Sequence, residues 1–140
     1  MTLVHAAFEE YRGQLDPPSG AHNETPQTFR QALRTGYAAL ALVNDAAVGC
    51  VFYHQEGEHL YLGRLSVLQP FRRYGVGQAL TEYVEQRARA LGLPRVQLGV
   101  RTALPHLQAY YARLGYRVVR YEAHQGYTAP TYVVMEKQVV

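Results

Sequence analysis

The junction between residues 60 and 91 constrains the fold more than any other part of this sequence. An apolar, strand-like run from Leu60 to Leu68 leads into the segment Gln-Pro-Phe-Arg-Arg-Tyr-Gly-Val-Gly, which opens a long amphipathic helix. Gly75 and Gly77 stand where that helix begins, so no side chain covers the backbone there. A strand that runs into a glycine-rich helix start predicts a turn able to bind an anion.

The charges around the two glycines define the anion more closely. The start of a helix leaves backbone N–H groups unpaired and carries the positive end of the helix dipole. Arg72 and Arg73 add forked donors suited to phosphate oxygens. We interpret the segment as a pyrophosphate-binding turn; an arginine-rich strand–helix turn without a ligand is the alternative. It is neither a P-loop, because no Lys-Ser/Thr pair follows, nor a dinucleotide fingerprint, which needs three glycines.

Length and composition indicate one globular domain over residues 1–140. Apolar residues make up 48% of the chain, which is typical of a folded core. The net charge of +3 suits a polyanionic cofactor, but the basic residues form no stripe of the kind that binds nucleic acid. We therefore expect no nucleic-acid partner.

Cysteine, histidine and leader patterns exclude several further classes. Cys50 is the single cysteine, so no internal disulfide can form, and a reducing, cytoplasmic compartment fits. No apolar run reaches 18 residues, and the first residues lack a basic leader, so we expect neither a membrane span nor a signal peptide. The six histidines show no ligand spacing, and we expect no metal.

Hydrophobic periodicity and turn residues predict the order of helices and strands. We expect helices over residues 2–13, 25–36, 75–91 and 104–114, the second with Thr25 as N-cap and Pro26 at its first position. We expect strands over residues 37–43, 48–54, 60–68, 95–100, 116–122 and 131–135. This order is typical of a mixed α/β domain on a largely antiparallel sheet.

The helix over residues 75–91 has two chemically different sides. Its expected apolar side carries Val76, Leu80, Tyr83, Val84 and Leu91. The other side carries Glu82, Glu85 and Arg89, of which Glu85 and Arg89 are spaced as an i,i+4 ion pair. We expect this second side to be solvated.

Two motifs together resemble the GNAT superfamily of N-acetyltransferases. Arg72, Gly75 and Gly77 match the spacing of its acyl-CoA motif, which follows the fourth strand. The segments 98–100 and Tyr111-Ala-Arg-Leu-Gly-Tyr116 resemble its second motif, a strand followed by a tyrosine-bearing helix and a Gly-aromatic pair. The resemblance covers about residues 60–117 and implies a twisted, mostly antiparallel sheet whose fourth and fifth strands splay apart between flanking helices.

The resemblance also implies a set of site residues. The pantetheine arm of acetyl-CoA would pair with the backbone of Leu65 and Val67, and a strand N–H, that of Val67, would stabilise the oxyanion. Tyr111 would protonate the leaving thiolate, with Tyr110 as the rival assignment and a core tyrosine as the alternative. The cofactor-binding residues would be Leu65, Val67, Arg72, Arg73, Tyr74, Gly75, Val76, Gly77 and Gln78.

The sequence departs from the family pattern at three places. Leu104 takes the place of a usual Asn and is a poor helix N-cap, so Thr102 or water would have to satisfy those donors. Tyr61 takes the place of a usual glutamate base. The candidate bases are bulk water and Glu56, Glu58, His59, Glu122 and His124.

The third departure is at the N-terminus, where the strand that normally precedes the first helix is missing from the pattern. Such a sheet exposes an edge, and exposed edges are commonly paired or covered. We therefore expect a homodimer.

The resulting hypothesis is an acetyl-CoA-dependent N-acetyltransferase that acts on a small-molecule or peptide amine by direct attack in a ternary complex. A route through acyl-Cys50 is disfavoured, because nothing marks that thiol as activated. The alternatives are a non-catalytic CoA-binding sensor or structural module, and a nucleic-acid-directed acyltransferase. The loops around residues 14–24 and 122–131 do not identify the amine.

Overall fold

A computed structural model describes residues 25–140 of the chain. The predicted helix over residues 2–13, and with it the question of a missing first strand, lies outside the described residues. The helices are α2 (Pro26–Thr35), α3 (Val76–Ala90) and α4 (Pro105–Arg113), with a short 3₁₀ turn at Gln69–Phe71. The strands are β1 (Tyr37–Val43), β2 (Ala46–Glu56), β3 (His59–Val67), β4 (Arg95–Arg101), β5 (Arg117–Glu122) and β6 (Tyr132–Gln138).

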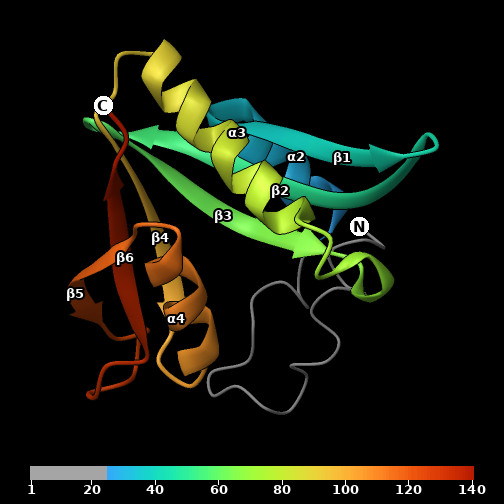
Figure 1. Cartoon of the computed structure of the whole chain (residues 1–140). Coiled ribbons are helices and arrows are strands. Elements are labelled where there is room, and N and C mark those ends of the chain that lie inside the picture. The colour runs from blue at the N-terminus through green and yellow to red at the C-terminus, as the bar shows by residue number, and fades with distance from the viewer. Residues whose placement is uncertain (1–24) are drawn as a thin grey trace.

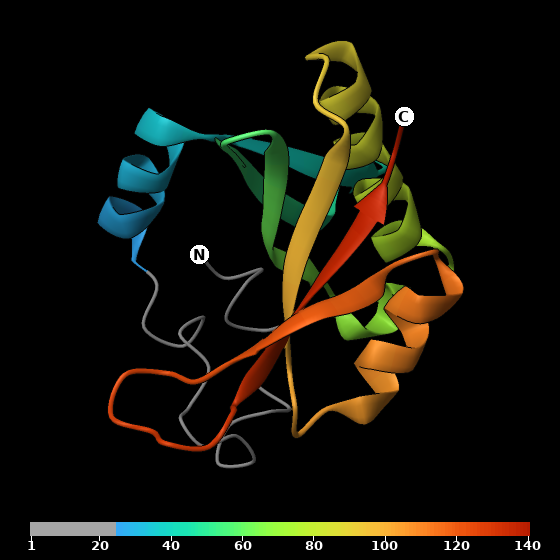
Figure 2. The same cartoon turned by 90° about the vertical axis from the view of Figure 1, so that its left-hand side faces the viewer.

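The six strands form one sheet in the order β1-β2-β3-β4-β6-β5. Only the β3–β4 pair is parallel, and the other four pairs are antiparallel. Figure 2 shows α2 on one side of the sheet and α3 with α4 on the other. The predicted fold class, a mixed α/β domain on a mostly antiparallel sheet flanked by helices, is therefore confirmed.

The main core lies between the sheet and the face covered by α3 and α4. Leu60 and Leu62 of β3 are buried there with Val96 and Leu98 of β4, against residues such as Val84 of α3. Because side chains alternate along a strand, Tyr61 of β3 and Gly99 of β4 lie on the opposite face. A smaller cluster on that face joins Cys50 and Phe52 of β2 to Phe29 and Ala32 of α2.

The strands β3 and β4 separate halfway along their length. They pair in register only over His59–Leu62 and Arg95–Leu98, after which β3 leaves its neighbour while β4 stays paired with β6 as far as Arg101. Beyond the split, β3 carries a bulge, because Cys50 lies opposite Ser66 but Phe52 lies opposite Gly63, and Arg64 has a φ of 51°. The predicted splay is confirmed, and Figure 1 shows the two strands diverging from their common end.

Most predicted boundaries lie within two residues of the observed ones. The Thr25 side chain accepts a hydrogen bond from the N–H of Thr28, and the Thr28 side chain accepts one from the N–H of Thr25, so the predicted cap of α2 is confirmed as a capping box. Strand β6 was predicted too short. Its last residues, 136–138, are polar but pair with Arg95–Gln97, and this pairing rather than apolar periodicity extends the strand.

The prediction of a solvated face on α3 was wrong for Glu85, which is 3% exposed. Its carboxylate accepts a hydrogen bond of 2.9 Å from the Tyr116 hydroxyl and one of 3.1 Å from Lys137 Nζ. The predicted i,i+4 partner, Arg89, is also present, with 4.0 Å between Nη2 and Glu85 Oε1. Glu85 thus joins α3 to the start of β5 and to β6. The prediction was also wrong for Tyr83 and Leu91, which were placed on the apolar side of the helix but are 42% and 45% exposed.

We expect Tyr116→Phe to lower the free energy of unfolding by about 1.5–3 kcal/mol at pH 7, because a buried carboxylate loses a hydrogen-bond donor. Burial and the Glu85 carboxylate raise the pKa of the Tyr116 phenol. A raised pKa in the folded state means that the contribution is intact below pH 10, the usual tyrosine value, and is lost as the pH rises above it. Urea unfolding at pH 7, 9 and 11 measures both effects.

The matched control for this prediction is Tyr121→Phe, at a position that is 64% exposed on β5. The alkaline loss of stability should be shallower in Tyr116→Phe than in the parent, and unchanged in the control. Equal pH slopes in the parent and in Tyr116→Phe would contradict the assigned network.

Candidate active site

The turn between β3 and α3 has the open backbone that the glycines predicted. Gly75 is the N-cap of α3 and has a φ of 83°, a left-handed conformation that glycine adopts without strain. A Cβ placed on Gly75 would meet no atom within 4 Å, and one on Gly77 would meet only the Tyr110 hydroxyl at 3.7 Å and Val67 Cγ2 at 3.8 Å. The backbone is therefore accessible at the positive end of α3, as an anion-binding turn requires.

The other predicted phosphate-binding residues surround this turn. No side chain caps α3, and its first turn holds no acidic residue. Arg73 and Tyr74 are exposed, Tyr74 to 80%, while Val76 is partly buried. The Gln78 side chain donates a hydrogen bond of 3.0 Å to Glu82. At this position only the backbone N–H is therefore a candidate donor to phosphate. These residues fit a pyrophosphate group.

Arg72, which we predicted to contact phosphate, also contacts the backbone of β3. Its Nε donates a hydrogen bond of 3.0 Å to the carbonyl oxygen of Val67, the last residue of β3. The neighbouring Leu68 N–H bonds back to the Val48 carbonyl. Since successive residues of a strand direct their backbone groups to opposite edges, the N–H of Val67 points away from β2, toward the side where β4 has diverged.

Tyr111 is buried, and Tyr110 lies closer to the glycine turn. Tyr111 is 8% exposed and packs edge-on against Tyr110 and Tyr116, with ring centroids 5.1 and 5.8 Å away. Tyr110 is partly buried, and its hydroxyl is the group that a Cβ on Gly77 would approach. The two tyrosines of the second motif therefore lie side by side, and these contacts do not distinguish which of them is the general acid.

A cavity of about 430 Å³ lies on the sheet face opposite to α3 and α4. Its walls come from β3, β4, the loop after β5 and the start of β6: Tyr61, Gly99, Arg101, Ala123, His124, Gln125 and Tyr132. Tyr61 and Gly99 directly adjoin Leu62 and Leu98, the last residues that pair β3 with β4. The cavity therefore lies at the point where the two strands separate.

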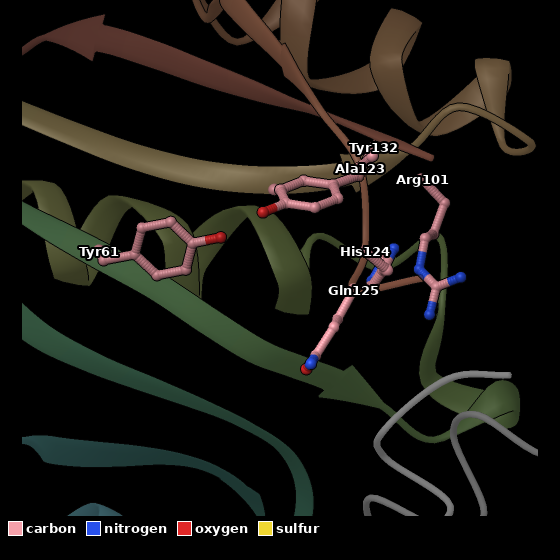
Figure 3. Close-up of a pocket in the computed structure, with 7 residues that line it drawn as sticks. Tyr61, Arg101, Ala123, His124, Gln125 and Tyr132 are labelled. Atoms are coloured by element: carbon pink, nitrogen blue, oxygen red, sulfur yellow. The ribbon is translucent and has the colours of Figure 1, made fainter. Parts of the chain in front are cut away.

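The side chains in the cavity divide into two groups. Figure 3 shows the hydroxyl groups of Tyr61 and Tyr132 pointing toward each other at one end, with Arg101 and His124 at the other. Gly99 makes room for the first group, since a Cβ there would lie 2.8 Å from the Tyr61 hydroxyl. Burial, and to a lesser degree the Tyr132 phenol, raises the pKa of Tyr61, which keeps that hydroxyl protonated.

Of the five side chains considered as a base, His124 alone lines this cavity. Glu56 instead contacts His54 and His59, Glu58 lies beside Arg95, and Glu122 pairs with Arg120 at 2.8 Å. Those three carboxylates and His59 are not among the residues that line the cavity. His124 is held through its backbone N–H and its ring Nδ1, both in contact with the Thr131 hydroxyl oxygen. Burial and the nearby Arg101 charge lower the pKa of His124, so its ring is neutral at pH 7.

Three further residues singled out in the sequence are Leu104, Thr102 and Cys50. Leu104 is the N-cap of α4 and makes no side-chain cap, as predicted. Thr102 does not replace it, because both its N–H and its hydroxyl bond to the Thr131 carbonyl oxygen. Cys50 is buried, and burial raises the pKa of its thiol, which disfavours the nucleophilic thiolate.

No helix within residues 25–140 is long and apolar enough to cross a membrane. The same residues contain no group of three or more His, Cys, Asp or Glu side chains arranged to hold a metal ion.

Comparison with known proteins identifies the class that this fold and site define. The model of the Acetyltransferase (GNAT) family matches residues 3–116. The chain therefore belongs to the GNAT family of acetyltransferases, and the resemblance inferred from the two motifs is confirmed.

Solved structures share the fold at low sequence identity. Aminoglycoside 6'-acetyltransferase type Ii is 20% identical with a TM-score of 0.74, and the match covers 99% of this chain and 86% of that one. The ribosomal-protein-S18-alanine N-acetyltransferase of Escherichia coli is 18% identical with a TM-score of 0.72, covering 83% and 77%. A GNAT acetyltransferase from Elizabethkingia anophelis, solved with acetyl-CoA bound, is 16% identical with a TM-score of 0.67, covering 81% and 83%.

Sequence reasoning missed most of the cavity wall. Arg101, Gln125 and Tyr132 were not candidates, because Arg101 lies 24 positions before Gln125 and 31 before Tyr132, and only the sheet brings them together. One local signal was available: Gly99 interrupts an apolar strand, and such a glycine often marks a close approach by another group.

Proposed function

We propose that this protein is an acetyl-CoA-dependent N-acetyltransferase that transfers an acetyl group directly to an amine in a ternary complex. The observation that carries the proposal is the split between β3 and β4, whose apex is the last pair of these strands, Leu62 and Leu98. An open glycine turn lies at the end of β3, and a cavity lies at the apex on the opposite face of the sheet. Two ligands that enter from these two sides can meet at the split without a covalent intermediate on the protein.

The turn is the proposed site of the CoA pyrophosphate. The N–H groups of residues 73–78 would hold its oxygens, helped by the charges of Arg72 and Arg73 and by the dipole of α3. Bound acetyl-CoA would supply the thioester. Solved relatives with bound acetyl-CoA or coenzyme A support this choice of cofactor.

The free edge of β3 is the proposed site of the pantetheine arm. Residues Leu65 and Val67 lie beyond the last β3–β4 pair, so their backbone can bind an extended chain as a further strand would. The N–H of Val67 is our candidate to stabilise the negative oxygen that develops during transfer. Leu65 is the alternative donor, because it lies nearer to the apex and hence to the cavity.

Tyr111 is the proposed general acid. It would donate the phenolic proton to sulfur as the C–S bond breaks and the N–C bond forms, and it is reprotonated from solvent afterwards. The buried, raised-pKa thiol of Cys50 makes an acyl-cysteine route unfavourable.

We propose His124 as the base that takes a proton from the ammonium group of the acceptor and so frees the amine that attacks, because its neutral ring lines the same cavity as Tyr61 and Gly99 at the split. His124→Gln should lower kcat/KM by about 10²-fold, near the lower end for general-base groups, since bulk water can also accept the proton. The parent kcat/KM should decline only below pH 6.5, the usual histidine value, since the pKa is lowered. A pH profile of acetyl transfer, with the exposed His106→Gln on α4 as control, measures both.

If the decline of kcat/KM at low pH is unchanged in His124→Gln, bulk solvent rather than His124 deprotonates the acceptor. In that case His124 would serve only to position the loop after β5 through its contacts with Thr131.

A non-catalytic CoA-binding module is the alternative function. Tyr61 and Leu104, which stand where relatives carry a glutamate and an asparagine, favour it. A screen of acetyl-CoA consumption over small amines, peptides and aminoglycosides separates the two functions. The enzyme releases CoA in proportion to an added amine, whereas the sensor binds acetyl-CoA and leaves it intact.

We propose that the protein forms a homodimer and acts in the cytoplasm. The edge strand β1 exposes Leu40 and Leu42 to about 60% each, which supports pairing of this edge in a homodimer. The free, buried Cys50 is compatible with a cytoplasmic enzyme, and we propose no nucleic-acid partner.

A further inference from the structure

Two phenol groups converge at the apex of the split. Tyr61 of β3 directly precedes Leu62, the last residue that pairs with β4, and Tyr132 begins β6 on the other side of β4. Figure 3 shows their hydroxyl groups pointing toward each other in the cavity. Within residues 25–140, no hydrogen bond joins the two hydroxyls or reaches them from another group. Both phenol oxygens are therefore able to bind a ligand.

Gly99 allows one of these oxygens to lie over the apex. A Cβ at this position would lie 2.8 Å from the Tyr61 hydroxyl and 3.5 Å from Cδ2 of Tyr132. Gly99 directly follows Leu98, the β4 member of the last pair between the two strands. Any larger residue here would push the Tyr61 hydroxyl away from the point where the strands separate.

The rings that carry the two hydroxyls are packed against histidines. The centroid of the His54 ring lies 5.7 Å from that of Tyr61, and the centroid of His124 lies 4.9 Å from that of Tyr132. His54 is opposite Tyr61 in the pairing of β2 with β3, and its Nε2 lies 2.7 Å from a carboxylate oxygen of Glu56. These contacts restrain the rings and leave the oxygens available. Preorganised groups of this kind bind a ligand at a low cost in conformational entropy.

The chemistry of a phenol suits the nitrogen of an acceptor. Burial, and to a lesser degree the Tyr132 phenol, raises the pKa of Tyr61, so its hydroxyl stays neutral, and a neutral phenol oxygen accepts hydrogen bonds as well as donating one. A primary amine that is ready to attack has two N–H groups and one lone pair. When each N–H donates to one phenol oxygen, the lone pair remains free for the thioester.

We propose that Tyr61 and Tyr132 together bind the acceptor nitrogen at the apex through its two N–H groups, and so select an amine that is primary. The inference rests on the proposed acetyl transfer and adds the residues that hold the acceptor nitrogen. His124, the proposed base, lies against the Tyr132 ring, so the ammonium group of the acceptor can lose its third proton beside this pair.

The test compares primary amines with their N-methyl derivatives, which have a similar basicity but keep only one N–H group. Benzylamine is paired with N-methylbenzylamine, and glycinamide with N-methylglycinamide. The ratio of kcat/KM for the primary over the secondary amine is measured by release of CoA in the parent, in Tyr61→Phe and in Tyr132→Phe. The control is Tyr121→Phe, at an exposed position of β5 outside the cavity.

The parent should favour the primary amine by about 3- to 10-fold, the range for one neutral hydrogen bond. In either cavity variant the primary amine loses one of its two hydrogen bonds, whereas the secondary amine can use the phenol that remains. The ratio should therefore fall to near unity in Tyr61→Phe and in Tyr132→Phe, and Tyr121→Phe should preserve it. The Kd for CoA should stay unchanged in all three variants.

Binding can also be measured without turnover. Saturation-transfer NMR of benzylamine on the complex of the protein with CoA should show weaker binding in both cavity variants than in the parent and in Tyr121→Phe. Equal binding of benzylamine in the parent and in both cavity variants would contradict the assignment.

Gly99→Ala gives an independent test that leaves both hydroxyls on the chain. The new Cβ should displace the Tyr61 hydroxyl and lower the ratio of primary over secondary amine to near unity. In the Tyr61→Phe background the oxygen that the Cβ would meet is gone, so the same substitution should cause no further change. Circular dichroism checks that each variant is folded.

A parent ratio near unity, or a preference for the primary amine that survives both Tyr61→Phe and Tyr132→Phe, overturns the assignment of the acceptor nitrogen to the two phenols while acetyl transfer itself stands. Binding of acetyl-CoA without transfer to any amine overturns the proposed function, and with it this inference.

Discussion

Gly77→Val is expected to abolish detectable CoA binding while the protein stays folded. A Cβ at this position has only ordinary contacts, at 3.7 and 3.8 Å, so a side chain can be accommodated by the fold itself. The branched side chain would instead cover the N–H groups at the start of α3. Loss of two charge-assisted hydrogen bonds, each worth about 1.5–3 kcal/mol, raises the Kd by more than about 100-fold.

Isothermal titration of CoA, with circular dichroism as a check on folding, measures this effect. The matched control is Ala90→Val, which puts the same side chain at an exposed position near the other end of α3. Arg72→Ala should weaken CoA by less, although it also releases the Val67 carbonyl oxygen. Unchanged CoA affinity in folded Gly77→Val would mean that the phosphate site is misassigned.

Tyr111→Phe is expected to lower kcat by about 10²–10⁴-fold with little change in CoA affinity. The substitution keeps the ring and its edge-on packing against Tyr110 and Tyr116, and it removes only the phenolic proton. Steady-state kinetics with an identified amine, together with CoA titration, separate the loss of a proton donor from a loss of binding.

Tyr110→Phe is the matched control, one residue away on the same helix. Its effect on kcat should be mild. If Tyr110→Phe is instead the damaging change, the acid is the hydroxyl beside Gly77, and the alignment of the second motif is off by one residue. If both variants retain full activity, water protonates the leaving sulfur and Tyr111 is a core residue.

Local signals were sufficient to predict the elements that carry the cofactor motif. Gly75 and Gly77 located the start of α3, and the apolar run after Leu60 located β3, because both signals lie within a few residues of the structure that they produce. The splay between β3 and β4 came from the family resemblance. The local feature that accompanies the splay is the bulge near Arg64, and the hydrophobic periodicity of the sequence did not predict that bulge.

Long-range contacts explain what local patterns could not predict. Glu85 looks like a solvent-facing helix residue, yet Tyr116 and Lys137, 31 and 52 positions away, bury and satisfy its carboxylate. The cavity has the same origin. His124 was one of five candidate bases in the sequence, and only the packing of the loop after β5 against β3 and β4 distinguishes it.

Mass spectrometry of both the protein and the acceptor after a single turnover tests the central claim most directly. The enzyme is mixed with stoichiometric acetyl-CoA and then with an amine that supports CoA release. Direct transfer predicts that the acetyl group appears on the amine nitrogen at the rate of CoA release, and that the protein mass never increases by an acetyl group. Accumulation of acetyl-protein at Cys50 before the amine is added, or CoA binding without any acetylated amine, would contradict direct transfer in a ternary complex.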